Sequence, residues 1–176
     1  MICSDLQAGG VQRVVARASS MLQNAGNKVI VITLSDSASD FYRLEPKIVR
    51  KTLGLKGPSG SLYAGIKANL QRISAIRKEI RGSECEIIVS FVTATNILTL
   101  LANLFLKTKL IVSERNDPSK QPLGFSWKVL RTLTYPFAYR VTANSRNAVY
   151  SLQKSLLFSK VHFLPNPLPL EGNISE

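Results

Sequence analysis

Short apolar runs alternate along this chain with longer segments whose apolar residues repeat at helical spacing. Residues 28–34 (Lys-Val-Ile-Val-Ile-Thr-Leu) form an almost unbroken β-branched run, which is typical of a strand buried on both faces of a sheet. Residues 62–81 instead repeat Leu or Ile every three or four positions, which predicts an amphipathic helix. Because helices between such strands act as crossovers, the pattern predicts an α/β fold with a doubly wound, mainly parallel, Rossmann-like sheet.

The same interpretation extends over the whole chain. Strands are expected at residues 2–4, 28–34, 47–52, 86–91, 109–113, 140–143 and 160–164. Helices are expected after the turn at Gly9 and Gly10, and at residues 62–81, 94–106, 125–137 and 145–155. Three prolines follow in residues 165–170 and exclude helix there. We therefore expect one domain over residues 1–164 and an extended linker over residues 165–176.

In a sheet of this kind, ligands bind at the carboxyl ends of the strands, where the strand order reverses. The loops expected at that edge are residues 5–10, 91–96, 113–117 and 144–145. The first loop carries Gly9 and Gly10 at the start of a helix, where bare backbone N–H groups and the helix dipole favour an anion. A tight turn without any ligand explains the two glycines equally well.

Composition excludes several classes of protein. Hydrophobic residues make up 45% of the 176 residues, which is enough for one core, and no apolar run reaches the roughly 18 residues of a membrane-spanning helix. No signal-peptide pattern is visible at the N-terminus. Cys3, Cys85 and His162 are too few and too scattered for a disulfide framework or a metal site. We expect packing roles for these three residues, no metal, and a cytoplasmic location.

The net charge of +12 is concentrated in two blocks. Residues 40–82 hold ten Lys and Arg against three acids, and residues 107–160 hold ten against two. Such blocks imply an anionic partner, which could be nucleic acid, an anionic membrane surface or a phosphorylated ligand. The alternative is a basic surface that contacts only solvent. A basic nucleic-acid- or anion-binding module without catalysis is thus the competing function. No helix-turn-helix, zinc finger or RNP-like strand appears, so we expect no nucleic acid.

Four segments stand in a fixed order along the chain. They are Gly9-Gly-Val-Gln-Arg-Val-Val15, Ile88-Val-Ser-Phe-Val-Thr-Ala-Thr-Asn96, Ile111-Val-Ser-Glu-Arg-Asn-Asp-Pro118 and Leu164-Pro-Asn-Pro-Leu168. Together they resemble family 4 glycosyltransferases of the GT-B fold over essentially the whole chain. The third segment is similar to the subgroup that extends cell-surface or lipid-linked glycans. A dinucleotide-dependent oxidoreductase fits poorly, because the glycine turn lacks the Gly-x-Gly-x-x-Gly spacing.

The resemblance implies an architecture and a reaction. GT-B enzymes have two doubly wound domains, of which the N-terminal one mainly receives the acceptor and the C-terminal one mainly holds the nucleotide sugar. This chain is similar to the N-terminal half alone, with a shortened first strand. The resemblance therefore implies the acceptor-binding half of a retaining glycosyltransferase, inactive by itself, whose partner is its own C-terminal GT-B domain. It also implies a UDP- or GDP-sugar as donor and no cofactor.

The resemblance further assigns roles to residues. The backbone of Gly9, Gly10 and Val11 would bind the donor diphosphate. Glu114 and Arg115 are the catalytic candidates: Glu114 would orient the acceptor and Arg115 would anchor a phosphate or carboxylate. Arg115 stands where many relatives carry a histidine, and arginine is not a base at neutral pH. The alternative is that Glu114 and Arg115 only satisfy their own loop and each other.

The acceptor, a glycan or a lipid-linked sugar, would be bound by side chains from three of the edge loops. These are Thr93, Asn96, Asn116 and Asn144. Asn96 is equally well explained as a residue of the capping region of the following helix.

Residues 120–140 interleave aromatic and aliphatic side chains with Lys and Arg. This composition suits the headgroup region of an anionic leaflet, and Trp127, Lys128 and Arg131 are the expected membrane contacts. We therefore expect peripheral attachment to the inner face of the cell membrane. Core packing of the same helix explains its leucines equally well.

Overall fold

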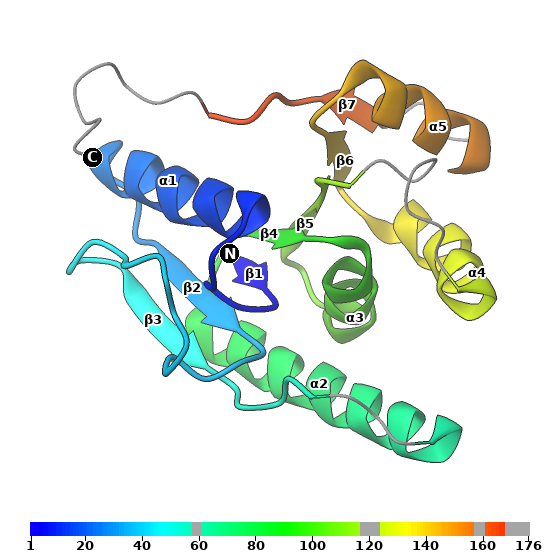
Figure 1. The fold of residues 1–176 in the computed structure, drawn as a ribbon, viewed down its shortest axis with the longest axis horizontal. Helices are drawn as coiled ribbons and strands as arrows, with labels where there is room; N and C mark the ends of the chain where they lie inside the picture. The colour runs from blue at the N-terminus through cyan, green and yellow to red at the C-terminus, as the bar shows by residue number, and fades with distance from the viewer. Residues whose placement is uncertain (58–60, 117–123, 157–160, 168–176) are drawn as a thin grey trace.

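The computed structural model describes residues 1–57, 61–116, 124–156 and 161–167, and within these ranges seven strands form a single sheet. The strands are β1 (Ile2–Cys3), β2 (Ile30–Thr33), β3 (Val49–Thr52), β4 (Ile87–Phe91), β5 (Lys109–Glu114), β6 (Arg140–Ala143) and β7 (Val161–Phe163). Their order is β3-β2-β1-β4-β5-β6-β7, and every neighbouring pair is parallel (Figure 1). The predicted α/β fold with a doubly wound parallel sheet is confirmed.

The helices lie within a few residues of their expected positions. They are α1 (Gly10–Asn24), α2 (Leu62–Ser83), α3 (Thr93–Asn103), α4 (Phe125–Thr134), the 3-10 helix η1 (Tyr135–Phe137) and α5 (Arg146–Leu156). The helix expected over residues 125–137 is divided into α4 and η1, because Pro136 cannot donate the backbone hydrogen bond that would continue α4. The described part of the expected linker, residues 165–167, has no regular structure, and residues 168–176 lie outside the described residues.

Alternation along the strands produces two hydrophobic cores, one on each face of the sheet. On one face, Val31 of β2 belongs to a cluster with Val14 and Val15 of α1. On the other face, Ile32 belongs to a larger cluster with Ile76 of α2 and with residues of α3, η1 and α5. Figure 1 accordingly shows α1 on one side of the sheet and α2 and α3 on the other.

The strand order reverses between β1 and β4, which are neighbours in the sheet although α1, β2, β3 and α2 separate them in the sequence. The loops that leave β1 and β4 therefore run in opposite directions and open a crevice at the carboxyl edge. Val92, the N-cap of α3, lies in the loop after β4 with φ 71°, a region that costs a β-branched residue free energy and is concentrated at functional sites. The loops on the two sides of the reversal point, after β1 and after β4, are two of the four that were expected at the carboxyl edge.

Only part of α2 packs against the sheet. Ile76 and Ile80 are buried, but Ile66 and Leu70 in the N-terminal half are more than half exposed. The apolar stripe of residues 62–81 is therefore not a core stripe along its whole length, and its N-terminal turns project past α3 (Figure 1). None of the helices described combines the length and the apolar character that crossing a bilayer requires.

The three residues expected to have packing roles differ in placement. Cys3 is buried and Cys85 packs half-buried against the larger core. His162 of β7 is exposed, so the prediction that it is a packing residue is wrong.

Candidate functional site at the carboxyl edge of the sheet

The Gly9-Gly10 turn places the start of α1 beside the reversal point. Gly9 is the N-cap in an extended conformation, no side chain caps the helix, and no acid lies in its first turn. The first N–H groups of a helix have no acceptor within the helix, so those of Gly10, Val11 and Gln12 point outward from α1. A Cβ added at Gly10 would meet no atom within 4 Å, which leaves this end of the helix open to a ligand.

Gly9 has a second, structural reason to be glycine. A Cβ added there would overlap the side-chain amide of Gln12. That amide donates from Nε2 to Asp5 Oδ1 at 2.8 Å. Gly9 therefore keeps space for a contact between α1 and the loop that follows β1.

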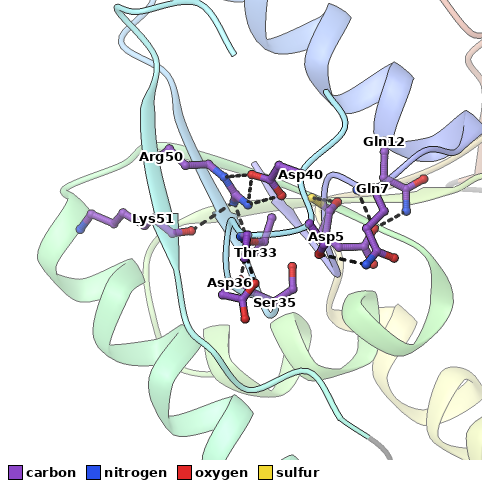
Figure 2. Close-up of polar contacts among 12 residues, drawn as sticks. Asp5, Gln7, Gln12, Thr33, Ser35, Asp36, Asp40, Arg50 and Lys51 are labelled. Atoms are coloured by element: carbon purple, nitrogen blue, oxygen red, sulfur yellow. Dashed lines mark hydrogen bonds and ion pairs between the residues drawn. The ribbon is translucent and has the colours of Figure 1, made fainter. Parts of the chain in front are cut away.

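Asp5 is the centre of a polar network that the sequence analysis did not identify (Figure 2). Its carboxylate accepts hydrogen bonds from Lys56 Nζ at 2.6 Å, from Ser4 Oγ at 2.9 Å and from the backbone N–H of Gln7 at 3.2 Å, besides the one from Gln12. Burial alone would raise the pKa of Asp5, but these hydrogen bonds outweigh it and hold the pKa below its usual value. Asp5 is therefore a buried, ionised carboxylate at the edge where a ligand would bind.

The loop that follows β2 is held against β3 by an ion pair. Arg50 donates to both carboxylate oxygens of Asp40, at 3.0 and 2.8 Å, and also to the hydroxyl of Thr33 (Figure 2). Thr33 Oγ1 in turn donates to the carbonyl of Ser35 at 2.9 Å. These bonds connect the end of β2, the loop after it and β3 into one unit.

Arg115 joins the ends of three strands. Its Nε donates to Ser113 Oγ at 2.9 Å and its Nη1 donates to Asn166 Oδ1 at 2.8 Å, while the guanidinium lies 5.9 Å from the ring centre of Phe91. Asn144 Nδ2 donates to the Arg115 carbonyl at 3.3 Å. Burial lowers the pKa of Arg115. Arg115 and Asn144 thus meet at the edge as predicted, together with Asn166, which had been considered only as part of the linker motif.

Glu114, by contrast, lies beneath the edge rather than in it. It is fully buried, and its carboxylate accepts hydrogen bonds from Tyr135 Oη and from Thr93 Oγ1, the latter at 3.1 Å. Asn96 is also fully buried and donates from Nδ2 to Tyr135 Oη at 3.3 Å and to the Ser113 carbonyl at 3.4 Å. Glu114 was expected in an edge loop where it could orient an acceptor, but residues of α3 and η1 enclose it. Thr93 and Asn96 likewise face this internal cluster and not an acceptor.

The buried cluster shifts the acid–base properties of its members. Burial raises the pKa of Glu114, although the bonds from Tyr135 and Thr93 act in the opposite direction. Burial, together with the adjacent Glu114 carboxylate, also raises the pKa of Tyr135. Arg131, whose charge lowers both pKa values, is only 4% exposed. Arg131 is therefore an internal residue, and the prediction that it contacts a membrane is wrong.

The remaining predicted residues are placed as follows. Asn116 is half-buried directly after the β5 edge, and Asp117 lies outside the described residues. On α4, Lys128 is exposed, whereas Trp127 is half-buried against the larger core. Lys120 and Leu123 of the expected membrane segment also lie outside the described residues.

Comparison with known proteins gives this arrangement a context. Residues 8–171 match the model of Glycosyltransferase Family 4. The chain is 29% identical over 177 residues to the "GalNAc-alpha-(1->4)-GalNAc-alpha-(1->3)-diNAcBac-PP-undecaprenol alpha-1,4-N-acetyl-D-galactosaminyltransferase" of Campylobacter jejuni. This alignment covers 99% of this chain and 47% of the relative. The chain therefore spans about half the length of this curated relative.

Solved structures show the same fold at low sequence identity. Sucrose-phosphate synthase from Thermosynechococcus elongatus has a TM-score of 0.74 at 12% identity, over 93% of this chain and 47% of that chain. The lipopolysaccharide outer core galactosyltransferase WaaB in its apo form has a TM-score of 0.68 at 9% identity, over 95% of this chain and 45% of that chain. With the match over residues 8–171, the chain belongs to Glycosyltransferase Family 4.

Proposed function

We propose that this chain is the acceptor-binding half of a retaining glycosyltransferase, which transfers a sugar from a UDP- or GDP-sugar to a glycan or lipid-linked acceptor. The observation that carries the proposal is the open carboxyl edge at the reversal of strand order, in a chain of this family that covers 47% of its Campylobacter relative. The other half of the enzyme would supply most of the donor site. The chain by itself is then inactive.

At this edge the chain offers one contact suited to the donor. The uncapped start of α1 presents N–H groups, with Gly10 leaving room for a bulky anion. A diphosphate placed there would be stabilised by the helix dipole as negative charge develops on the leaving group. The chain's contribution to the reaction is thus electrostatic, and neither a metal nor a cofactor is part of the proposal.

The names of two relatives favour a lipid-linked or cell-surface acceptor. The Campylobacter relative is named for a saccharide linked through PP to undecaprenol, and WaaB is named for the lipopolysaccharide outer core. Arg115, as an anchor for a phosphate or carboxylate, and Asn144 are the contacts proposed for such an acceptor at this edge.

The test measures binding and transfer separately. The 176-residue chain is titrated with N-acetylgalactosaminyl-diphosphoundecaprenol in detergent and is assayed for transfer of radiolabelled sugar from UDP-N-acetylgalactosamine. Saturable acceptor binding without transfer is expected. Transfer by the chain alone contradicts its inactivity, and absence of acceptor binding contradicts the acceptor role. Tighter binding of duplex or single-stranded oligonucleotides at physiological salt would instead favour the anion-binding alternative.

Contact with an anionic membrane surface is a second part of the proposal, and exposed apolar stripes on two helices favour it. Phe125 and Leu133 on α4 are 83% and 61% exposed, and Lys128 is exposed on the same helix. On α2, Tyr63 and Leu70 are exposed beside several basic residues. Apolar side chains next to Lys or Arg suit the headgroup boundary of an anionic leaflet.

Vesicle sedimentation tests the membrane contact. Vesicles with phosphatidylglycerol should bind the chain, phosphatidylcholine vesicles should bind it more weakly, and salt should weaken the binding. Leu133→Ser should weaken binding several-fold, whereas Phe105→Ser is the matched control, because Phe105 is 97% exposed but precedes β5 at the amino edge of the sheet. Equal effects of the two substitutions on vesicle binding would mean that α4 does not contact the membrane surface.

A further inference from the structure

A polar pocket lies on the β3 side of the reversal point, away from Arg115. It has a volume of about 330 Å³ and is formed by the loops that follow β1, β2 and β3. Its polar lining consists of Gln7, Ser35, Asp36, Ser39 and Lys56, and Gly54 completes one wall. The volume falls in the lower range of small-molecule sites, which is about 300–1,000 Å³.

One wall of the pocket carries a buried hydroxyl group, that of Ser35, which makes no hydrogen bond to the described residues. Ser35 is 6% exposed, and its Oγ has no hydrogen-bond partner among the described residues. A buried polar group without a partner costs free energy, so such groups are rare and call for an explanation. Because Ser35 lines the pocket, a ligand that donates to or accepts from this hydroxyl would satisfy it.

The walls of the pocket are held in place by bonds to the rest of the fold. Arg72 of α2 donates to the carbonyls of Leu55 and Gly57, at 2.8 and 3.0 Å. Gln7 Nε2 donates to Ser39 Oγ at 3.0 Å and so connects the loops after β1 and β2. With the Arg50–Asp40 ion pair already described, the described residues of all three loops are bonded to the rest of the fold or to one another. A preorganised site of this kind loses little conformational entropy on binding.

The charges around the pocket favour a neutral ligand over an anion. Lys56 is already paired with Asp5, with Nζ and Oδ2 2.6 Å apart. Asp36 adds a second carboxylate, which accepts one hydrogen bond from the Ala38 N–H and retains further acceptor capacity. Of the two charged residues that line the pocket, Lys56 is already paired and Asp36 would repel a phosphate, whereas vicinal hydroxyls could donate to Asp36 and accept from Lys56.

We infer that this pocket binds a neutral sugar ring of the acceptor, with Ser35, Asp36 and Gln7 as its hydrogen-bonding residues. The inference rests on the proposed acceptor role and names the place where the acceptor saccharide lies. The pocket is coupled to the start of α1, because Asp5 accepts from both Lys56 and Gln12. The sugar would thus lie on the opposite side of the reversal point from the Glu114 cluster, which is closed to any ligand.

The test follows ¹⁵N–¹H correlation spectra of the 176-residue chain during titration with methyl α-N-acetyl-D-galactosaminide, with sodium phosphate as a parallel titration. The glycoside should perturb the amide signals of Ser35, Asp36 and Gly54. Ser35→Ala should lower the affinity about fivefold and Asp36→Asn about tenfold, as the loss of one neutral and one charge-assisted hydrogen bond predicts. Ser37→Ala is the matched control, because Ser37 is on the same loop, is exposed and does not line the pocket.

Ser35→Ala should fold normally, because its hydroxyl makes no internal bond. Perturbations confined to other loops, equal effects of Ser35→Ala and Ser37→Ala, or a response to phosphate in place of the glycoside would each overturn the inference. If the pocket variants still bind the lipid-linked acceptor with the parent affinity, the sugar subsite is elsewhere and the acceptor role stands. If the parent chain binds neither the glycoside nor the lipid-linked acceptor, the acceptor role itself is wrong.

Discussion

Two acidic residues at the carboxyl edge, one on each side of the reversal point, have opposite environments. Asp5 follows β1 and is held ionised by Gln12, Ser4 and Lys56, the last of which lines an open pocket. Glu114 ends β5 and is enclosed with Tyr135, its pKa raised by burial. The sign of the pKa shift is decided by whether hydrogen bonds and charges outweigh desolvation.

The difference shows that position after a strand does not by itself make a residue part of the site. After β1, residues 4–9 lead directly into α1, and Gln7 of this loop lines the pocket beside Asp5. At β5 the helices α3 and η1 approach closely enough to cover the strand end. We therefore interpret the Glu114 cluster as structural, whereas the pocket beside Asp5 is the one inferred to bind a sugar.

The largest expected effect is on the closed side. Glu114→Ala should lower the free energy of unfolding by about 4 kcal/mol, because it leaves a cavity and deprives Tyr135 and Thr93 of their acceptor. Urea denaturation followed by the fluorescence of Trp127 measures this loss. Glu114→Gln, which keeps the volume and one acceptor oxygen, should cost less than half as much. A loss below about 1 kcal/mol for Glu114→Ala would mean that the cluster is open to water.

On the open side the corresponding substitution should cost less. Asp5→Ala should lower the free energy of unfolding by about 2 kcal/mol, because Lys56 and Gln12 lie near the surface and can bond to water instead. Asp36→Ala is the control for this loop region, since Asp36 is exposed and accepts only from Ala38 among the described residues. If Asp5→Ala costs as much as Glu114→Ala in the same urea series, the contrast between the two sides fails.

The pH dependence of stability should have opposite signs on the two sides. The pKa of Glu114 is raised above 4.5, so the unfolded chain loses this proton first, and its contribution to stability falls as the pH rises above about 4.5. The pKa of Asp5 is held below 3.8, so its contribution is complete above about pH 3.8 and is lost as the pH falls through the folded-state pKa.

Urea unfolding from about pH 3 to pH 8 measures both contributions. The free energy of unfolding of Glu114→Gln should increase relative to that of the parent as the pH rises. The free energy of unfolding of Asp5→Asn should instead approach that of the parent at the lowest pH values. The same slope for both variants would contradict the assigned environments.

The fold was predictable because its signals are local. A β-branched run such as residues 28–34 or a glycine pair before an apolar repeat can be recognised within a few residues, and helices between such strands then predict a parallel sheet. The half-exposed α2 shows the limit of such signals. Its apolar stripe continues through Ile66 and Leu70 to Ile76, but where the sheet stops covering it depends on the tertiary arrangement.

The candidate site could be predicted from the sequence only where its residues belong to a single loop. Gly9 and Gly10 form such a loop, but Asp5 and Lys56 are 51 residues apart, and no spacing rule connects them. The local sequence around a carboxylate at the end of a strand does not reveal whether the side chain will be exposed to solvent or covered by a helix. The burial of Glu114 depends on Thr93 and Tyr135, each 21 residues away.

The smallest expected effect distinguishes the two glycines of the open side. Gly10→Ala should change the free energy of unfolding by no more than about 0.5 kcal/mol, because its Cβ meets no atom within 4 Å and alanine favours helix. Gly9→Ala should cost about 1 kcal/mol, because its Cβ displaces the Gln12 amide from Asp5. Urea midpoints of the two variants give the comparison.

Activity should reverse this order. In a protein that also contains a donor domain, Gly10→Ala should lower the initial rate of sugar transfer despite its unchanged stability, because the new methyl group occupies the space through which a diphosphate would approach α1. Gly9→Ala should affect the rate mainly through its stability. A rate equal to that of the parent for Gly10→Ala would mean that the diphosphate does not bind at this turn. The proposal that the open side binds a ligand would then depend on Asp5 and the pocket beside it.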